Sequence, residues 1–384
     1  ATWASILMAS SYYPQLTSSP SRVVFNLGTS RGDRRRVSLR SCNGAGAVLV
    51  LILKDVVRPN TSVFTDLIES YCKVGKWKQA FRILQLMQTR YECNPTTKTY
   101  NHLLKGLSYV GRVEESYKLF SKMKERDAFS YSSLMNGFCK VGRTDEAFEL
   151  LEEAILAGLS PSVAMFNSLL HGFSREGRPL EGFKVLERMK NGYCQPDYVT
   201  HSTLLHGLIL WGESRLAVEV YKEMRRAEFE VDGSLKKSLV RCLCRVCCSG
   251  YDAAALDYAY QLFEEMKSNP SNVDHGVGTL MIRSLCAANK SEEASATLRF
   301  MVELGIAPRL IIWNLVIGKL CLNGNVEEAF KNLLLLYEVG RMPSRTSYDV
   351  VIHELNRQGR SFAARLLFAA ALVRGVVLAR HPAR

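Results

Sequence analysis

The chain has 384 residues, a formal net charge of +13 and 47% hydrophobic residues, proportions that are typical of folded proteins and exclude wholesale disorder. No run of about 18 or more uncharged apolar residues is present, so the sequence predicts no membrane-spanning helix. The eleven cysteines are thinly spread and odd in number, which favours reduced thiols over a disulfide framework.

Residues 1–45 differ in composition from the rest of the chain. They contain one acidic residue, Asp33, against six arginines, and they are dense in Ser and Thr. Such a start predicts an organellar transit peptide, with a disordered basic tail as the alternative. The segment from Met8 has no Arg before Arg22, which favours a plastid (chloroplast) over a mitochondrion. Residues 1–60 carry +6 of the net charge of +13, so almost half of the excess positive charge lies in and just after the segment that is predicted to direct the chain to an organelle.

The sequence after residue 60 repeats a single pattern. The segments 128–162, 163–197 and 310–344 each have 35 residues and align without gaps. Extending this period gives nine units, called repeats 1 to 9, which span 61–96, 97–127, 128–162, 163–197, 198–232, 233–274, 275–309, 310–344 and 345–379. Residues 46–60 resemble a degenerate half-repeat that would cap repeat 1, and 380–384 form a short tail.

Apolar residues within each repeat follow helical spacing. An aromatic residue usually stands fourth and apolar residues stand seventh and eleventh, which places them on one helical face. A glycine at position 15 of most repeats ends this first helix, and a small residue at position 20 lets a second helix approach closely. Because one hairpin cannot bury its faces alone, we predict an all-α fold, a right-handed superhelical α-solenoid of about nine helix-turn-helix repeats.

The twelfth position of five repeats is a cysteine, which predicts small, buried packing residues on the first helix. These are Cys72, Cys139, Cys244, Cys286 and Cys321. Cys244 and Cys247 have the spacing of a zinc-ligand pair, but a tetrahedral zinc site takes a second pair from another element. We therefore predict no metal site and no cofactor.

Two segments depart from the repeat pattern. Repeat 6 carries an insertion, residues 248–255, at its hairpin turn, where we expect a protruding loop or an extended helix. The last predicted helix, 362–373, is apolar almost all round, although the end of a solenoid needs a polar outer face. This helix is a candidate for contact with a protein partner or for self-association.

Short motifs carry a family resemblance. Repeat 3 contains Phe138-Cys139-Lys140-Val141-Gly142-Arg143, and repeat 4 ends in Gln195-Pro196-Asp197. Together with the hairpin period, these motifs resemble the pentatricopeptide repeat family over residues 61–379. The tetratricopeptide alternative has a period of about 34 residues and a Trp-x-x-Leu-Gly-x-x-Tyr opening, which is absent. The resemblance implies a plant organellar protein that binds single-stranded RNA parallel to the array, one base per repeat.

In that family the fifth and last residues of a repeat together read one base. The matching pairs are Asn101 with Asp127 and Asn167 with Asp197 (like uracil-reading pairs), Ser202 with Asp232 (like a guanine pair), and Asn314 with Ser344 (like a pyrimidine pair that favours cytosine). The other candidates are the ambiguous Ser132 with Ser162, and Thr65 of repeat 1, whereas repeats 6, 7 and 9 depart from the pattern. The implied RNA site is x-U-x-U-G-x-x-C-x.

Two further sets of positions are implied by the resemblance. Base-sandwiching residues at the second position are Phe129, Ala164, Val199 and Ile311. Phosphate-binding residues at position 13 are Lys73, Lys140, Arg175, Arg245 and Arg357. Contacts of the second set would make RNA binding fall with salt. The alternative for that set is an interaction with the nearby helix C-terminus.

The sequence contains no recognisable catalytic constellation. It lacks the zinc-deaminase signature and a Gly-x-x-x-x-Gly-Lys phosphate loop, and His353-Glu354 lacks the second histidine of a zinc protease. We predict a non-enzyme whose partner is single-stranded RNA, with no membrane and no small-molecule substrate. Its predicted role is sequence-selective binding in organellar transcript stabilisation, processing, splicing or translation. The alternative is a structural subunit or scaffold of an organellar ribosome or other complex.

Overall fold

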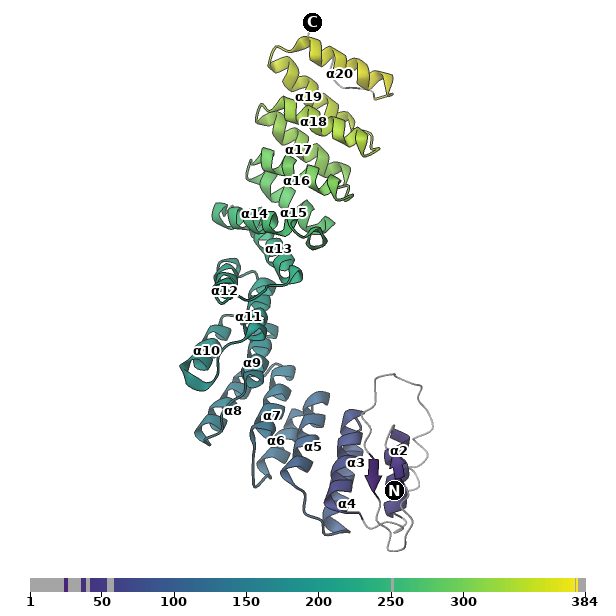
Figure 1. Cartoon of the computed structure of the whole chain (residues 1–384), viewed down its shortest axis with the longest axis vertical. Coiled ribbons are helices and arrows are strands. Elements are labelled where there is room, and N and C mark those ends of the chain that lie inside the picture. Colours follow the sequence, from purple (N-terminus) through teal and green to yellow (C-terminus); the bar gives the residue numbers. More distant parts are fainter. Residues whose placement is uncertain are drawn as a thin grey trace. The chain divides into compact units, whose positions relative to one another are not determined.

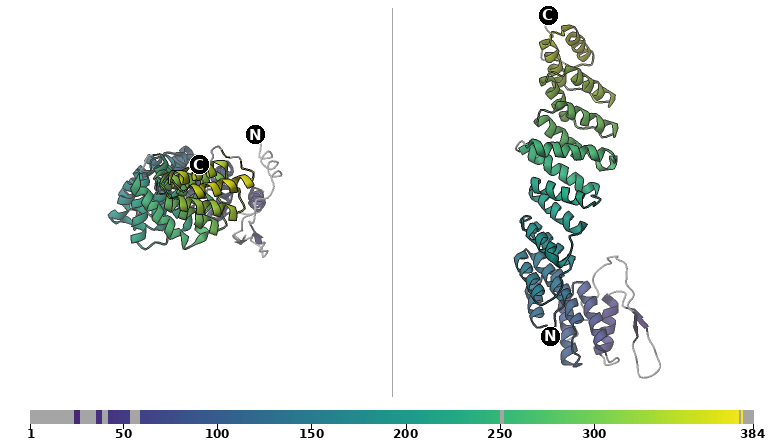
Figure 2. Two further views of the ribbon diagram at one scale, coloured as in Figure 1. Left: turned by 90° about the horizontal axis from the view of Figure 1, so that it is seen from above. Right: turned by 60° about the vertical axis from the view of Figure 1, so that its left-hand side comes forward.

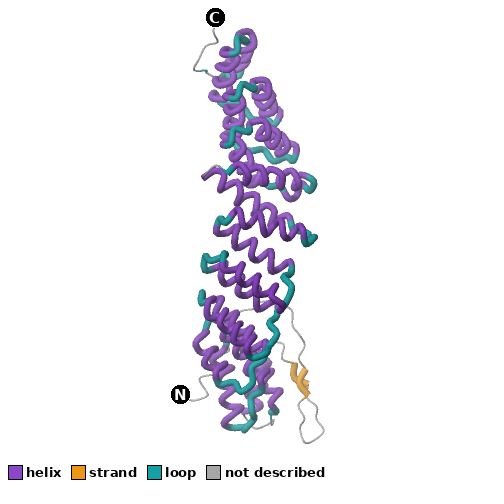
Figure 3. Tube along the Cα trace, turned by 90° about the vertical axis from the view of Figure 1, so that its left-hand side faces the viewer, coloured by secondary structure: helices purple, strands orange, loops and turns teal. Residues whose placement is uncertain are grey.

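The computed structural model describes residues 24–26, 36–38, 42–53, 59–249, 252–376 and 378. Most of the predicted transit peptide therefore lies outside the described residues. The chain divides into two compact units, residues 1–200 and 201–384. Helices joined by short loops dominate both units (Figure 3). None of the helices in the described ranges combines the length and the apolar character needed to cross a bilayer.

The N-terminal part of unit 1 contains two short strands that the sequence did not predict. β1 (Val24–Asn26) pairs antiparallel with β2 (Arg36–Ser38), with Phe25 opposite Val37. Helix α2 (Cys42–Leu53) follows and contacts α3. Ile52 of α2 is fully buried, and its carbonyl oxygen accepts a hydrogen bond of 2.8 Å from the hydroxyl of Tyr91. These contacts place α2 against the first hairpin, and its role as a half-repeat cap remains our proposal.

Unit 1 continues as a stack of helical hairpins. The pairs are α3 (Thr61–Lys73) with α4 (Trp77–Thr89), α5 (Thr97–Val110) with α6 (Val113–Ser121), α7 (Ala128–Val141) with α8 (Thr144–Leu156), and α9 (Val163–Arg175) with α10 (Glu181–Arg188), which the π-helix η2 (Met189–Tyr193) extends. The first helices α3, α5, α7 and α9 contact one another in turn (Figure 1).

Unit 2 repeats this arrangement, although the first three residues of its first helix, Tyr198 to Thr200, belong to unit 1. Its pairs are α11 (Tyr198–Trp211) with α12 (Ser214–Arg226), α13 (Gly233–Ser249) with α14 (Ala253–Lys267), α15 (His275–Ala287) with α16 (Ser291–Glu303), α17 (Leu310–Leu322) with α18 (Val326–Glu338), and α19 (Arg345–Arg357) with α20 (Ser361–Val373). The short 3-10 helix η3 (Pro270–Asn272) precedes α15. The first helices α13, α15, α17 and α19 contact one another in turn, and Figure 2 shows the paired helices from two further sides. The predicted all-α solenoid of helical hairpins is confirmed within each unit.

Glycine at position 15 ends the first helices, as predicted. Gly111 and Gly142 cap α5 and α7 with φ angles of +77° and +79°, in the left-handed region that a side chain disfavours. Repeat 7 has no glycine at this position. Asn289 stands there instead and adopts a φ of +62°, which asparagine tolerates better than most residues.

Small residues let the helices pack closely. The residues at position 20 are buried, as is Ala259, which the insertion of repeat 6 moves to position 27 of that repeat. Their burial confirms the predicted packing role of Ala80, Ser116, Ala147, Gly182, Ala217, Ala259, Ala294, Ala329 and Ala364. Glycine at position 10 allows neighbouring first helices to meet. A Cβ atom added to Gly106 of α5 would lie 2.7 Å from the Cβ and Sγ of Cys72 on α3. A larger residue at Gly106 would therefore push α3 and α5 apart.

The cysteines at position 12 are all buried, as predicted: Cys72, Cys139, Cys244, Cys286 and Cys321. Burial raises the pKa of the Cys72, Cys139 and Cys321 thiols to about 12, so these side chains stay protonated packing groups.

The irregular segments take definite forms where they are described. Helix α13 reaches Ser249 and has 17 residues, against 13 in α15, so the insertion of repeat 6 lengthens the first helix. Residues 250 and 251 of that insertion lie outside the described residues. On α20, Phe362 is 75% exposed and Val373 is 88% exposed, whereas Leu367 and Ala371 are buried. The last helix thus exposes apolar side chains to solvent, as its sequence predicted.

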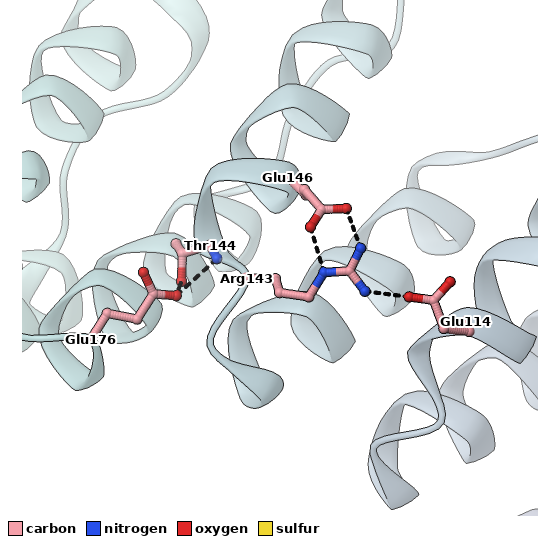
Figure 4. A network of polar contacts seen from close by, with 5 residues as sticks. All are labelled: Glu114, Arg143, Thr144, Glu146 and Glu176. Atoms are coloured by element: carbon pink, nitrogen blue, oxygen red, sulfur yellow. Dashed lines mark hydrogen bonds and ion pairs between the residues drawn. The ribbon is translucent and has the colours of Figure 1, made fainter.

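Polar contacts join successive hairpins near the starts of their second helices. Arg143, just before α8, forms ion pairs with Glu146 of α8 and with Glu114 of α6 (Figure 4). Glu176, just after α9, accepts hydrogen bonds from the backbone N–H and the hydroxyl of Thr144 (Figure 4). The contacts Arg143–Glu114 and Glu176–Thr144 each join one hairpin to the next, and Glu176 also satisfies a free N–H at the start of α8.

Candidate nucleic-acid interface

The predicted reading pair of repeat 2 is joined by hydrogen bonds. The Nδ2 group of Asn101, on the first turns of α5, donates to both carboxylate oxygens of Asp127 at 3.0 Å. Asp127 caps α7, where its carboxylate accepts a 2.8 Å bond from the backbone N–H of Ser130. Burial raises the pKa of Asp127, but the hydrogen bonds from Ser130 and Asn101 outweigh it and hold that pKa below its usual value. Asp127 is therefore an ionised, acceptor-only group.

Repeat 4 has the same arrangement. Asp197 precedes α11 and accepts hydrogen bonds from the backbone N–H of Thr200 at 2.7 Å and from its hydroxyl at 2.8 Å. The Oδ1 of Asn167 accepts a bond of 2.9 Å from the same hydroxyl. Burial raises the pKa of Asp197, and the hydrogen bonds from Thr200 and Asn167 lower it further than burial raises it. Asn167 and Asp197 thus lie together at the junction of two hairpins.

Repeat 8 replaces the aspartate with a serine. Ser344 caps α19, and its hydroxyl lies 3.0 Å from the Oδ1 of Asn314 on α17. The hydroxyl of Ser347 donates to the same Oδ1 at 2.6 Å. The carbonyl end of the Asn314 amide is therefore held by two hydroxyls.

The other predicted reading residues are placed differently. Thr65 is buried, and its hydroxyl bonds to the Thr61 carbonyl and the Thr99 hydroxyl, each at 2.8 Å. Ser132 is half-buried on α7, and the exposed Ser162 begins α9 without a side-chain capping bond.

The predicted reading pair of repeat 5 is Ser202 with Asp232. Ser202 lies half-buried on α11. Asp232 is exposed and accepts hydrogen bonds from the backbone N–H of Leu235 at 3.0 Å and from the Ser234 hydroxyl at 2.9 Å.

Repeat 6 contains a contact that the sequence analysis missed. Its last residue, Asp274, caps α15 but also accepts a 2.7 Å bond from the guanidinium of Arg241 on α13. Its fifth residue, Lys237, donates to the backbone carbonyl of Ser271 at 3.3 Å. In repeat 6, therefore, Arg241 neutralises the carboxylate that corresponds to Asp197 of repeat 4.

The sandwich candidates all lie exposed on the first turns of their helices. Phe129 is 47% exposed on α7, with the Lys105 ammonium 5.9 Å from its ring centre. Val199 on α11 is 52% exposed and Ile311 on α17 is 71% exposed, and Ala164 on α9 is also exposed. Position 2 lies three residues before the reading position, so both side chains share one face of the helix.

The phosphate candidates are exposed, but several already have partners. Lys73 pairs with Glu69 at 2.8 Å, and Arg357 forms a two-pronged contact with Glu354 at 2.7 and 2.6 Å. Arg175 donates to the Lys140 carbonyl at 3.4 Å, close to the C-terminus of α7, which fits the helix-terminus alternative.

The remaining two candidates lie on α7 and α13. The Lys140 ammonium lies 4.8 Å from the ring centre of Tyr109, and Arg245 is exposed. Tyr109 itself is 72% exposed at position 13 of repeat 2, where an aromatic residue was not singled out from the sequence.

Models of known repeat families match most of the chain after residue 58. The PPR repeat family model matches 59–108 and 161–209, two PPR repeat models match 98–127 and 125–155, and the model of the pentacotripeptide-repeat region of PRORP matches 211–332. These matches together cover more than half of the chain. The chain belongs to the pentatricopeptide repeat family.

Curated relatives of this pentatricopeptide repeat protein come from Arabidopsis thaliana. Pentatricopeptide repeat-containing protein At2g16880 is 33% identical over 85 residues, which are 22% of this chain and 11% of that protein. The chloroplastic pentatricopeptide repeat-containing protein At5g48730 is 30% identical over 67 residues, 17% of this chain and 13% of the relative. The matched region is thus a small part of each relative.

Solved structures of similar fold include two RNA complexes. PPR10 with an 18-nucleotide psaJ RNA element is 20% identical, with a TM-score of 0.41 over 86% of this chain and 52% of that one. Yeast Rmd9p with a 16-nucleotide target RNA is 13% identical, with a TM-score of 0.35 over 86% of this pentatricopeptide repeat protein and 69% of Rmd9p.

Proposed function

We propose that this chain binds single-stranded RNA selectively, one base per repeat, through the reading pairs of repeats 2, 4 and 8. The observation that carries the proposal is the ordered Asn–Asp or Asn–Ser pair at three hairpin junctions, with contacts of 2.6 to 3.0 Å. A fixed set of donors and acceptors is what hydrogen-bond readout of a splayed base requires.

The chemistry of the pairs favours pyrimidines. Uracil presents an N–H donor at N3 between two carbonyl acceptors, whereas N3 of cytosine is an acceptor. An ionised Asp127 or Asp197 accepts from uracil but repels the lone pair of cytosine. In repeat 8, Ser347 satisfies the Asn314 carbonyl, so the Ser344 hydroxyl is able to turn its proton toward N3 of cytosine.

Neighbouring side chains complete the proposed interface. Phe129, Val199 and Ile311 offer exposed apolar surfaces three residues before a reading position, and an aromatic stacking contact contributes about 1–3 kcal/mol per base. Lys140 and Arg245 are the position-13 cations that we propose for phosphate contact. Such contacts lower the logarithm of the affinity by about 0.7 for each tenfold rise in salt, per phosphate neutralised.

A gel-shift titration at one fixed salt concentration tests this function. We expect x-U-x-U-G-x-x-C-x RNA to bind more tightly than a scrambled oligonucleotide of the same composition, and equal affinities would contradict base reading. Asn101→Ala and Asn167→Ala should each weaken binding. Asn136→Ala, an exposed asparagine of α7 outside the reading pairs, is the matched control and should bind like the wild type.

We further propose that the protein acts in a plant organelle, with the plastid favoured. The Arg-rich and Ser-rich start of the chain and the chloroplastic relative support this location. Residues 1–60 fused to a fluorescent protein should enter plastids of plant cells. A fusion that stays in the cytosol, or that enters mitochondria alone, contradicts the assignment. The RNA process itself is proposed as stabilisation, processing, splicing or translation of an organellar transcript.

One observation favours a second candidate function, that of a structural subunit of an organellar complex. Helix α20 exposes Phe362, Leu366 and Val373, and repeats 6, 7 and 9 lack matching reading pairs. A protein contact or self-association through α20 would cover this surface. Cross-linking in organelle extract separates the two functions. One short RNA footprint supports sequence-selective binding, and co-sedimentation with a ribosomal subunit supports the structural role.

A further inference from the structure

We propose that the third residue of a repeat is a positioning residue when it bears a hydroxyl, because it fixes the asparagine that reads the base in the preceding repeat. The residues concerned are Ser130, Thr200 and Ser347. This inference rests on the proposed RNA function and adds a third member to the reading pair.

The geometry is the same at three junctions. The hydroxyl of Ser130 lies 2.6 Å from Asn101 Oδ1 and 2.8 Å from Asp127 Oδ1, so its one hydrogen is shared between these two acceptors. The hydroxyl of Thr200 likewise lies 2.9 Å from Asn167 Oδ1 and 2.8 Å from Asp197 Oδ1. The hydroxyl of Ser347 donates to Asn314 Oδ1 at 2.6 Å. The three hydroxyl-bearing residues are each at most 2% exposed. Because they are buried, bulk water does not replace the hydrogen bond when the hydroxyl is removed.

This bond decides which end of the amide is offered to RNA. The asparagine side chain has an acceptor end, Oδ1, and a donor end, Nδ2. With Oδ1 held by the hydroxyl, Nδ2 of Asn101 points to the carboxylate of Asp127 and donates to both of its oxygens at 3.0 Å. One of these two amide hydrogens is the donor that a bound base would take. An amide turned over would set its oxygen against the carboxylate and offer no donor. The hydroxyl therefore selects the donor face that pairs with a pyrimidine carbonyl.

The sequence of this chain varies in step with the geometry. All three asparagines at a fifth position are followed by Ser or Thr at the third position of the next repeat. Where the fifth residue is not asparagine, the third residue of the next repeat is usually apolar: Met165 after Ser132, Leu235 after Ser202, Val277 after Lys237, and Ile312 after Thr279.

The consequence of an apolar third residue is visible in repeat 7. The hydroxyl of Thr279, at the reading position, is buried and has no hydrogen-bond partner. Its counterpart in repeat 1, Thr65, bonds to the hydroxyl of Thr99 at 2.8 Å. The third residue thus determines whether the reading side chain is held.

Thr99 also provides the matched control. Both threonines take part in helix capping, because each hydroxyl accepts a hydrogen bond from the backbone N–H of the residue three positions earlier. The donor is Thr96 for Thr99 and Asp197 for Thr200, each at 3.3 Å. Thr99→Val and Thr200→Val therefore remove the same kind of capping bond. Thr99→Val also releases the hydroxyls of Thr65 and Thr96. Thr200→Val instead releases the amide of Asn167 and removes a contact to the Asp197 carboxylate.

The test compares affinities for two RNAs that differ only in U or C at the base assigned to repeat 4. We expect Thr200→Val to lower the U-over-C preference at that base roughly fivefold, the worth of one hydrogen bond. The preference at the base assigned to repeat 2 should stay unchanged, and Thr200→Ser should restore the wild-type ratio. Thr99→Val should leave both ratios unchanged.

The outcomes separate this inference from the function on which it rests. A wild-type protein with no U-over-C preference at either base overturns the reading pairs and the inference together. A wild-type preference that survives Thr200→Val, or that falls equally in Thr99→Val, overturns the positioning role alone. Circular dichroism of each variant at the assay temperature establishes that a lost preference does not come from unfolding.

Discussion

Repeats 4 and 6 both end in an aspartate, but the two carboxylates have different neighbours. Asp197 and Asp274 both lie at the start of a following first helix, where each accepts a bond from the backbone N–H three residues on. Burial raises the pKa of both carboxyls, and hydrogen bonds bring both pKa values below their usual range. As helix caps the two aspartates are equivalent.

The surroundings of the two carboxylates differ. Asp197 accepts hydrogen bonds from neutral groups of Thr200 and Asn167. Asp274 is bound by the guanidinium of Arg241 at 2.7 Å. We infer that an aspartate at the end of a repeat is not by itself a reading residue. In our proposal, base reading also needs a neutral fifth residue and a hydroxyl-bearing third residue beside the aspartate.

The largest expected effect comes from removing each aspartate in turn. Asp197→Ala should weaken binding of the x-U-x-U-G-x-x-C-x RNA about tenfold or more, because a base contact of this kind contributes about 1–3 kcal/mol. Asp274→Ala should leave RNA affinity almost unchanged. Each variant should lose about 1 kcal/mol of unfolding free energy, the usual worth of a helix cap. Parallel gel shifts and urea titrations measure both effects, and an equal loss of affinity in the two variants contradicts the comparison.

The next effect is a gain of function in repeat 6. The triple change Lys237→Asn, Arg241→Ala and Val277→Thr rebuilds the surroundings of Asp197 around Asp274. We expect a new U-over-C preference of about fivefold at the base assigned to repeat 6, because one additional hydrogen bond is formed. The loss of two positive charges weakens affinity for all RNAs, so the ratio of the two affinities is the measurement. An unchanged ratio would show that other features of repeat 6 prevent reading.

A smaller effect concerns pH. The folded-state pKa of Asp197 lies below its usual value of 3.8, so the ionised carboxylate stabilises the fold above that value. This contribution should be constant above about pH 5 and should fall as the pH drops through the lowered pKa. Asp197→Asn does not titrate and is the reference. On acidification the wild type should lose under about 1 kcal/mol of unfolding free energy relative to this variant, since the Asp197 side chain is exposed. Urea titrations of both proteins between pH 7 and 3 measure the difference, and a wild-type advantage that grows on acidification has the wrong sign.

The smallest effect is expected away from the reading pairs. Arg143→Ala removes ion pairs to Glu114 and Glu146 that are partly exposed. We expect a loss of at most about 1 kcal/mol of unfolding free energy, which shrinks as salt screens the charges. The U-over-C ratios should not change. A shift in these ratios would mean that base reading depends on contacts between second helices.

The repeat pattern in the sequence predicted the hairpins because each feature is a local rule. Gly111 and Gly142 end helices through their positive φ, and Ala147 or Ala217 allows close packing through its size. The buried cysteines follow from the same period. Family resemblance then supplied the candidate reading positions, although it did not indicate which candidates contact one another.

What the sequence analysis missed depends on contacts between repeats. Arg241 was not linked to Asp274, because the contact joins residues 33 positions apart whose pairing only the fold defines. The hydroxyls of Ser130 and Thr200 were overlooked although they recur, since the capping pattern alone explains a Ser or Thr at that place. The sequence pattern did not indicate that Asn289 takes the left-handed conformation of the glycine that repeat 7 lacks. It also did not distinguish a protruding loop from an extended helix in repeat 6, where α13 is lengthened.

A binding selection from an RNA pool with randomised bases, at one fixed salt concentration, tests the central claim most directly. The account predicts bound RNA with U at two positions separated by a single base, which repeats 2 and 4 read. It also predicts C four bases beyond the second U, and no preference two bases beyond that U, where repeat 6 lies. A bound pool with no positional preference, or with a U preference at repeat 6 as strong as that at repeat 4, would contradict it.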